Sequence, residues 1–379
     1  MTIDVAAFDR IFDPKSVAVV GDKGQAGYMW LNSMSTFRGS VYSVQLDERE
    51  IPGIEALGIK NYKSLLDIPG PVDYVVVAVP RKISPMILED LIAKNVGGAT
   101  FYTSGFAETA TEEGIALQKA LTQRAREANF MLVGPNCMGI YVPEIGLRFS
   151  TEQPAGEGGQ VGWIGQSGTH SMNFSLLGAV HGIKVSKMVS FGNAIVLDSP
   201  DYLEYMGQDP ETRIIGMYVE GFKDGRLFFE TLRRVAGEKP VVLWKGGQTG
   251  DGARAVASHT ASLATEASVW DSLIKQCGAI TVDSLEEMID IIKALLYIKP
   301  STGTRMGIMA LTGGQSVVSA DAFAKAGLQV PLLTETSYEE LSTFFSVIGA
   351  SYRNPFDISS NLPDHNILVR LLEILERDE

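Results

Sequence analysis

One acidic residue and one histidine in the chain have neighbours that would let them act together on a phosphoryl group. Glu220 ends the apolar run "MYVEG", and His259 lies in "ARAVASHTASLATEASVW", where the flanking residues are small. Small neighbours leave the imidazole uncrowded, and the hydroxyl groups of Ser258 and Thr260 can donate hydrogen bonds to anionic oxygens. An uncrowded imidazole can attack phosphorus while a carboxylate holds its second N–H. A lone loop histidine is more often inert, but this pattern predicts a phosphorylated His259 in the loop after "KGGQTGDG".

A candidate anion site lies at "GQSG", residues 165–168. The segment resembles the nucleophile elbow of serine hydrolases, but that motif needs G-x-S-x-G and residue 169 is Thr. What remains is a Ser-Gly pair that opens a helix after a strand, an arrangement that presents backbone amides to an anion. We therefore expect Gln166, Ser167 and Gly168 to bind phosphate, and His170 to be incidental. His259 has no His or Cys within helical reach, so no metal site is expected.

Three glycines follow the first apolar run, in "VAVVGDKGQAG" at residues 17–27. Gly21, Gly24 and Gly27 would suit a nucleotide phosphate held between a strand and a helix, and Asp47 could serve the ribose of NAD. The spacing is not G-x-G-x-x-G, and a lone glycine loop is weak support, so a plain turn stays an equal alternative.

The cysteines carry little chemistry of their own. Cys137 lies in "VGPNCMGI", a turn at the edge of a sheet where α/β proteins bind ligands. No neighbour in sequence would activate its thiol, which favours a buried structural cysteine. Cys137 and Cys277 are too few for a disulfide framework and fit a reducing cytosol.

Composition excludes several classes of protein. The 379 residues suggest two or three domains, and a net charge of −13 without a basic tract argues against a nucleic-acid partner. Since no apolar run reaches about 18 residues, no membrane span is expected. The acidic N-terminal stretch has no secretory pattern, so we expect a cytoplasmic protein.

The elements that must position these residues repeat the order strand, Gly-rich turn, helix, which predicts doubly wound α/β layers with parallel sheets. In the first unit we expect strands at 16–21, 39–44, 73–79, 98–104 and 130–134, and helices at 26–37, 83–94 and 111–128. In the second we expect strands at 161–165, 184–190, 213–219, 240–245 and 279–282. A polar linker is expected at 150–160. A third unit has strands at 306–314 and at "LQVPLL", too few for a complete layer, so we expect a part of something longer.

Ten motifs in order make the chain resemble the NDP-forming acyl-CoA synthetases, the superfamily of succinyl-CoA synthetase and ADP-forming acetyl-CoA synthetase. They are "IFDPKSVAVVG", "DIPGPVDYVVVAVP", "TSGFAE", "GPNCMG", "GQSG", "DYLEYMGQDPET", "YVEG", "KPVVLWKGG", "SHTASLA" and "NPFD". The resemblance covers nearly the whole chain and implies an α-subunit or N-terminal half. It implies a Rossmann-like CoA-binding domain at 1–147, a flavodoxin-like CoA-ligase domain at 158–299 and a second, incomplete flavodoxin-like ligase domain at 304–379.

The resemblance also implies a mechanism and its site residues. Phosphate would attack an acyl-CoA thioester, and the phosphoryl group of the acyl phosphate would pass to His259, oriented by Glu220, and then to ADP. The residues matching the family's CoA-binding positions are Gly21, Lys23, Gly27, Val79, Pro80, Ser104, Gly105, Asn136 and Cys137. The chain lacks an ATP-grasp domain, which binds ATP or ADP and Mg²⁺, so the resemblance implies an ATP-grasp β-subunit or fused C-terminal domain and a homo- or hetero-oligomer.

The chain departs from the family pattern around CoA. The first glycine loop is short, with Asp22 and Lys23 after Gly21, and "YSVQLD" replaces the family's "YPVNP". These departures keep open a non-catalytic CoA-binding or regulatory module as an alternative to the ligase. An NAD-dependent oxidoreductase is a third hypothesis, based on the glycine loop and Asp47.

Overall fold

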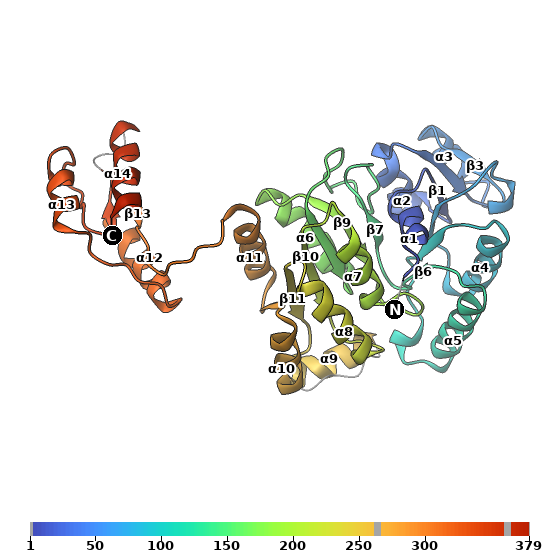
Figure 1. Cartoon of the computed structure of the whole chain (residues 1–379). Helices are drawn as coiled ribbons and strands as arrows, with labels where there is room; N and C mark the ends of the chain where they lie inside the picture. The colour runs from blue at the N-terminus through green and yellow to red at the C-terminus, as the bar shows by residue number, and fades with distance from the viewer. Residues whose placement is uncertain (1–2, 261–266, 360–364, 379) are drawn as a thin grey trace. The chain divides into compact units, whose positions relative to one another are not determined.

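The computed structural model describes residues 3–260, 267–359 and 365–378, with the backbone alone described at 257–260, 267–269 and 271. The chain divides into two units, Met1–Ile298 and Lys299–Glu379, which are treated separately below (Figure 1).

The first sheet has six parallel strands in the order β3-β2-β1-β4-β5-β6, the strand order of a Rossmann fold. The strands are β1 (Ser16–Val20), β2 (Ser40–Val44), β3 (Lys60–Tyr62), β4 (Tyr74–Val77), β5 (Gly98–Phe101) and β6 (Leu132–Val133). The central strands β1 and β4 are runs of apolar and β-branched residues buried along their whole length. Such runs are typical of parallel strands covered on both faces. The predicted Rossmann-like layer is confirmed, with β3 as a strand that the sequence did not reveal.

The helices of this layer are α1 (Val5–Phe12), α2 (Met29–Ser33), α3 (Ile51–Ala56), α4 (Ser84–Ala93) and α5 (Glu112–Glu127), with 3₁₀ turns η1 (Gly24–Ala26), η2 (Met34–Thr36), η3 (Leu65–Asp67), η4 (Arg81–Ile83) and η5 (Ala107–Thr109). The single helix expected at 26–37 is wrong, because three short pieces replace it. Gly27 and Tyr28 have φ of 64° and 48°, and left-handed residues cannot continue an α-helix.

The second sheet has the order β12-β11-β10-β8-β9-β7, and all its strands are parallel except β7, which runs antiparallel to β9. The strands are β7 (Gly139–Tyr141), β8 (Val161–Gly165), β9 (Val185–Ser190), β10 (Ile214–Val219), β11 (Val241–Lys245) and β12 (Ile280–Val282). The helices are α6 (Gly168–Val180), α7 (Ser199–Gln208), α8 (Gly225–Ala236), α9 (Gly250–Thr260), α10 (Ala267–Cys277) and α11 (Leu285–Tyr297). Helices α6 and α11 pack together against the sheet, as do α7 and α8 (Figure 1). Without β7, this is the flavodoxin-like strand order.

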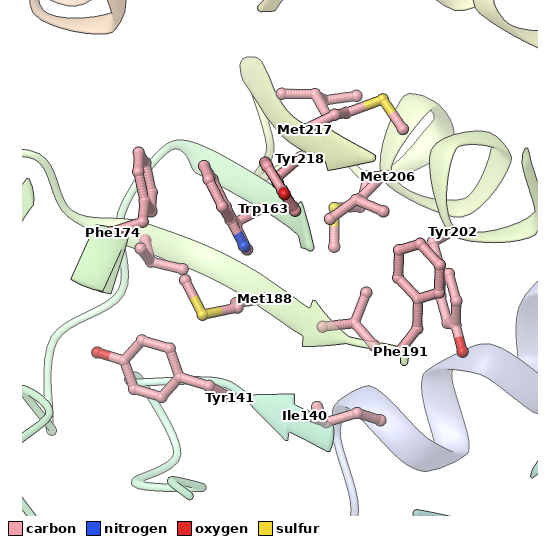
Figure 2. Packing of buried hydrophobic residues seen from close by; sticks show 14 of the residues in the cluster. Ile140, Tyr141, Trp163, Phe174, Met188, Phe191, Tyr202, Met206, Met217 and Tyr218 are labelled. Atoms are coloured by element: carbon pink, nitrogen blue, oxygen red, sulfur yellow. The ribbon is translucent and has the colours of Figure 1, made fainter. Parts of the chain in front are cut away.

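The chain crosses from one sheet to the other within residues 134–138, between β6 and β7. One hydrophobic cluster contains residues of both layers, including Val17 and Tyr74 of the first sheet and Trp163 of the second. Figure 2 shows the second-sheet part of this cluster, where the Trp163 ring stacks on Phe174 with centroids 4.1 Å apart. The two sheets therefore share one core.

The linker expected at 150–160 is instead a folded loop. Gln153 is 2% exposed, and its Oε1 accepts hydrogen bonds from the backbone N–H groups of Phe149 and Ser150. Its Nε2 donates to Ser175 Oγ at 3.0 Å. Within a segment that is mostly exposed, Gln153 thus makes hydrogen bonds inside the fold, which composition alone cannot distinguish from solvation.

The second unit has β13 (Met309–Ala310), α12 (Gly313–Lys325), α13 (Glu335–Ser342), β14 (Phe356–Asp357) and α14 (His365–Arg377), with β13 and β14 paired in parallel. The strand expected at "LQVPLL" is wrong: between Leu328 and Leu333 the chain makes only an isolated bridge from Gln329 to Arg305. Pro331 has no backbone N–H to give to a ladder. Among the helices of the described residues, none combines the length and the apolar character needed to cross a bilayer.

Candidate functional site

A cavity of 630 Å³ lies at the carboxyl edge of the first sheet. Parallel α/β sheets bind ligands where the strand order reverses, and here that point lies between β1 and β4. The lining residues that were predicted to bind CoA are Gly21, Lys23, Ser104 and Asn136, and the others are Asp22, Gln25, Ala26, Met29, Trp30, Ala78, Tyr102 and Thr103. We call this the first cavity. Lys23 is the one lysine among these lining residues.

The turn at Gly21 requires glycine. Its φ is 87°, and a Cβ built there would lie 2.6 Å from Val79 Cγ1 and 3.0 Å from the carbonyl oxygen of Ala78. Val79 thus supports the turn from behind, without lining the cavity itself.

Gly27, Pro80 and Gly105 also do not line the first cavity, although each lies close in sequence to a residue that does. Pro80 precedes η4, while the Gly105 carbonyl accepts a hydrogen bond from the Arg81 guanidinium. The structure therefore gathers Gly21, Lys23, Ser104 and Asn136 of the predicted CoA-binding set at the first cavity and places Cys137 in the wall of the second cavity, while Gly27, Val79, Pro80 and Gly105 line neither.

Two carboxylates hydrogen bond to the glycine loop, Asp22 from within it and Glu50 from the start of α3. Glu50 Oε2 accepts hydrogen bonds from the Gly24 N–H at 2.8 Å and from the Tyr28 hydroxyl at 2.9 Å. Asp22 accepts from the backbone N–H groups of Lys23 and Leu31 at 3.0 and 2.9 Å. Burial raises the pKa of Asp22, against the opposing effect of these hydrogen bonds. The loop thus already holds negative charge beside a cavity predicted to bind a polyanion.

A second cavity of 410 Å³ lies at the carboxyl edge of the second sheet. Its lining residues are Tyr102, Asn136, Cys137, Met138, Gln166, Ser167, Gly168, Thr169, Met172, Asn173 and Gly192. The predicted phosphate-binding residues Gln166, Ser167 and Gly168 therefore meet in one wall. Tyr102 and Asn136 line both cavities, so the two cavities meet at these side chains.

The wall formed by Ser167 and Gly168 is the start of helix α6. Ser167 caps the helix, because its Oγ accepts a hydrogen bond from the His170 N–H at 3.3 Å. A Cβ on Gly168 would lie 2.8 Å from Met138 Cγ, so a larger residue there would require this methionine side chain to move. The helix N-terminus carries a partial positive charge and backbone N–H groups, which suit an anion in the second cavity.

Glu220 is joined to this wall by Gln166. Gln166 is 6% exposed, and its Oε1 accepts hydrogen bonds from the N–H groups of Glu220 at 2.7 Å and Gly221 at 3.3 Å. The Glu220 carboxylate, itself 5% exposed, accepts a hydrogen bond from the Tyr218 hydroxyl at 3.2 Å. Gln166 thus fixes the end of β10, and with it the carboxylate, relative to the start of α6.

His170 lies beside the carboxylate and was not expected to have a role. Its ring centroid is 4.4 Å from that of Tyr218 and 4.5 Å from that of Trp244. Burial lowers the pKa of His170, while the negative charge of Glu220 acts in the opposite sense. An imidazole packed against two aromatic rings, with its pKa lowered by burial, therefore forms part of the surroundings of Glu220.

His259 falls near the end of α9, so the expectation of a loop is wrong. The stretch before it contains Ala253 and Ala255, and alanine has the highest helix propensity. Thr249 supports the first turn, where its Oγ1 accepts a hydrogen bond from the Gly252 N–H at 3.1 Å. The side chains of His259, Ser258 and Thr260 lie outside the described residues. The backbone of α9 packs against η5, which belongs to the first layer.

Cys137 is buried, as expected from its sequence context. It is 4% exposed, and its Sγ lies 3.8 Å from the carbonyl oxygen of Phe101. Burial raises the pKa of the Cys137 thiol far above its usual range. The thiol therefore stays protonated and does not act as a nucleophile.

Sequence reasoning missed Tyr102, Asn193 and Glu108. Tyr102 follows β5 and lines both cavities. Asn193 follows β9 and hydrogen bonds to Glu108. Their positions in the sequence could have indicated Tyr102 and Asn193, because both come just after strands. Ligand-binding residues gather at the carboxyl edge of a parallel sheet.

Two family models match the chain: a CoA binding domain at residues 15–143 and a succinyl-CoA ligase like flavodoxin domain at residues 158–295. The α subunit of the ADP-forming acetate–CoA ligase II of Pyrococcus furiosus is 35% identical, in a match that covers 92% of this chain and 76% of that subunit. The chain is a member of the NDP-forming acyl-CoA synthetase family.

Other comparisons agree with this membership. The ADP-forming acetate–CoA ligase I of Archaeoglobus fulgidus is 35% identical over 98% of this chain and 53% of its own length, so the chain spans about half of that relative. A solved structure from Candidatus Korarchaeum cryptofilum, a dinucleotide-forming acetyl-coenzyme A synthetase 1 in complex with phosphate and ADP, has a TM-score of 0.80 and 32% identity. That match covers 93% of this chain and 75% of the Korarchaeum chain.

Membership of the acyl-CoA synthetase family argues against the oxidoreductase hypothesis, and so does the geometry. Asp47, the residue expected to hold a ribose, does not line the first cavity. Its carboxylate pairs with the Arg49 guanidinium at 2.6 Å. Hydrogen bonds from Arg49 lower the pKa of Asp47 to about 2. The chain is similar instead to the α subunit of an ADP-forming acetate–CoA ligase.

Proposed function

We propose that this chain carries out the first two steps of an NDP-forming acyl-CoA synthetase. An oxygen of phosphate attacks the thioester carbonyl carbon, the C–S bond breaks, and CoA leaves with a proton from the phosphate. The product is an acyl phosphate in the second cavity. The observation that carries this proposal is that the first and second cavities share Tyr102 and Asn136 as walls.

The cavities suit the two ends of an acyl-CoA. The first cavity, of 630 Å³, has Lys23 and the turn at Gly21 for the diphosphate end. The second, of 410 Å³, has Gln166, Ser167 and Gly168 beside it for phosphate. Because a phosphopantetheine arm is long and narrow, the shared wall lets it pass from one cavity to the other.

The second step transfers the phosphoryl group to His259. An imidazole nitrogen attacks phosphorus, the P–O bond to the acyl group breaks, and the free carboxylate leaves. Glu220 is fixed by Gln166 at the end of β10 and would accept the other imidazole N–H. We assign Ser258 and Thr260 to hydrogen bonding with phosphoryl oxygens. These roles come from the family pattern together with the geometry of Glu220.

Transfer of the phosphoryl group from His259 to ADP needs a nucleotide site. We propose that an ATP-grasp domain supplies it, with ATP or ADP and Mg²⁺, from a partner subunit or another part of a longer chain. The Pyrococcus furiosus relative is named as an α subunit, which supports a partner subunit. We further propose three domains, 1–147, 158–299 and 304–379, which the family matches at 15–143 and 158–295 support for the first two.

The test is labelling of the chain with radiolabelled phosphate in the presence of a panel of acyl-CoAs. We expect acid-labile, base-stable label that requires an acyl-CoA, is lost in His259→Ala, and falls at least about tenfold in Glu220→Gln. His181→Ala removes a histidine from the end of α6 and serves as the matched control.

Wild-type protein that takes no label from any acyl-CoA while binding CoA would reject the proposal. That result would favour a non-catalytic CoA-binding module, the second candidate, which the carboxylates of Asp22 and Glu50 in the glycine loop support.

A further inference from the structure

The loop after β9 is pressed against the turn that links the two sheets. The Asn193 N–H donates a hydrogen bond to the Pro135 carbonyl at 3.0 Å, and the Ile195 N–H donates to the Gly134 carbonyl at 3.1 Å. A Cβ on Gly192 would lie 2.3 Å from the carbonyl oxygens of both Pro135 and Asn136. The two segments therefore form one packed unit beside the wall shared by the cavities.

The Asn193 side chain is 7% exposed and spans from this unit to the loop after β5. Its Nδ2 donates to Glu108 Oε2 at 2.7 Å and to Gln118 Oε1 at 3.0 Å. Glu108 in turn accepts hydrogen bonds from the N–H groups of Gly105 and Phe106. An ionised carboxylate only accepts, so Glu108 determines that the nitrogen of Asn193 faces it.

This orientation passes on to Asn136. With its nitrogen turned to Glu108, Asn193 presents Oδ1, which accepts a hydrogen bond from Asn136 Nδ2 at 3.4 Å. That contact uses one of the two Nδ2 hydrogens of Asn136. In the described part of the chain, no other protein group hydrogen bonds to the Asn136 side chain, which lines both cavities. One N–H donor and one oxygen are thus left for a ligand at the point where the cavities meet.

The backbone at this point is strained. Asn136 has φ of 58° and Ala194 has φ of 52°, in the left-handed region that residues other than glycine rarely adopt. Such conformations persist where the surrounding structure requires them, often at functional sites. The strain supports a role for this turn beyond joining two sheets.

We propose that Asn193, oriented by Glu108, is a positioning residue that sets Asn136 to donate its free amide hydrogen to the thioester carbonyl oxygen. As a phosphate oxygen bonds to the carbonyl carbon, the electron pair of the C=O bond moves to that oxygen, where Asn136 stabilises it. The pair then returns, the C–S bond breaks, and the thiolate takes the phosphate proton. This inference rests on the proposed function and concerns its first step alone.

Two labelling reactions separate the two steps in the full chain. Radiolabelled phosphate with the acyl-CoA of the panel that labels wild-type protein best requires both steps. The corresponding acyl phosphate, labelled on phosphorus, enters after the thioester step. We expect Asn193→Ala to lower the initial rate of the first reaction by about 10–100-fold, because one misplaced donor costs this much. The second reaction should stay within about twofold of wild type.

A paired exchange tests the hydrogen-bond logic. Asn193→Asp places a carboxylate against Glu108 and should lose at least about tenfold in the first reaction. Adding Glu108→Gln replaces the facing carboxylate by an amide, which can donate a hydrogen bond to the new carboxylate at position 193. The double variant should therefore recover most of that loss. Gln118→Ala removes the other acceptor and leaves Glu108 in place, so it should cost less than about threefold.

The outcomes are distinct. Wild-type protein that takes no label from either source would reject the proposed function itself. If wild-type protein is labelled but Asn193→Ala slows both reactions equally, or neither, the positioning role is wrong. Should Asn193→Ala fail to fold by circular dichroism, the double variant decides, because failure to recover relative to Asn193→Asp would also overturn the proposal.

Discussion

At the scale of single residues, the glycine loop combines features that favour and oppose a polyanionic ligand. Lys23 lines the first cavity, yet Glu50 occupies the N–H of Gly24 and lies close enough to Asp22 to help raise the pKa of that carboxyl, after burial. In a partly exposed loop, one charge is worth roughly 1 kcal/mol at most. Glu50 should therefore tune the affinity for CoA rather than prevent binding.

Glu50→Gln should bind CoA about 2–5-fold more tightly at low salt, since it removes a negative charge and keeps an oxygen for the Gly24 N–H. Isothermal titration of the whole chain at low and high ionic strength measures this, and the gain should shrink in salt. Glu55→Gln removes an exposed charge from the same helix, α3, and is the matched control. Equal gains in both variants would indicate a net-charge effect and contradict the specific role of Glu50.

His170 should make the stability of the chain depend on pH. Burial lowers its pKa in the folded chain below the 6.5 of an ordinary histidine, so the unfolded chain binds the proton more readily. The free energy of unfolding therefore has its full value above about pH 6.5 and decreases as the pH falls towards the pKa of His170 in the folded chain. The free energy of unfolding should therefore fall less on acidification in His170→Gln than in wild type.

Urea unfolding between about pH 7.5 and pH 5.5 measures this difference. His181→Gln, which removes an exposed histidine from the same helix, is the control. A wild-type profile identical to that of His170→Gln would contradict the prediction.

At the scale of elements, the sequence predicted most strands and failed where tertiary contacts decide. Every predicted strand of both sheets is present, because buried apolar runs between glycines are a local signal. The strand β7 and the crossing at 134–138 were missed, since three residues paired with β9 carry no periodic pattern. The same holds for the site: Gln166 and Glu220 were identified, but their hydrogen bond and the role of Asn193 depend on segments far apart in sequence.

Gly192→Ala tests the packing of the loop after β9. The added Cβ would meet two backbone carbonyl oxygens at 2.3 Å, at a φ of 54°. Because backbone cannot move aside cheaply, we expect a loss of about 2–4 kcal/mol in the free energy of unfolding, measured by denaturant titration. Gly225→Ala, at the start of α8, has nothing within 4 Å of its added Cβ and should change stability by less than about 0.5 kcal/mol. A similarly small change in Gly192→Ala would show that the loop can shift.

At the scale of the whole molecule, the two units have separate cores. Among the residues that the structure describes, the hydrophobic clusters of residues 1–298 share no member with the cluster of the second unit. The six buried residues of that cluster are Leu341, Phe345, Phe356, Ile358, Leu371 and Ile374. Stability and the proposed CoA site should therefore both belong to residues 1–298.

Residues 1–298 alone should melt within about 3 °C of the main transition of the whole chain and bind CoA within about twofold of its affinity. Differential scanning calorimetry and isothermal titration check the two quantities. A fragment that aggregates, or that binds CoA tenfold more weakly, would show that the second unit supports the first.

The core shared by the two sheets has a consequence for how substrate enters. A clamshell enzyme admits its ligand by rotating one lobe about a flexible linker. Here a rotation between the layers would separate Val17 and Tyr74 from the cluster that contains Trp163, and would break the hydrogen bond from Asn193 to Pro135. The two cavities, which meet at Tyr102 and Asn136, should therefore keep their relative positions when a ligand binds. Under the proposed function, a thioester needs the full arm of CoA to reach from Lys23 in the first cavity to Asn136, so truncated thiol analogues should fail as substrates even where their acyl group fits.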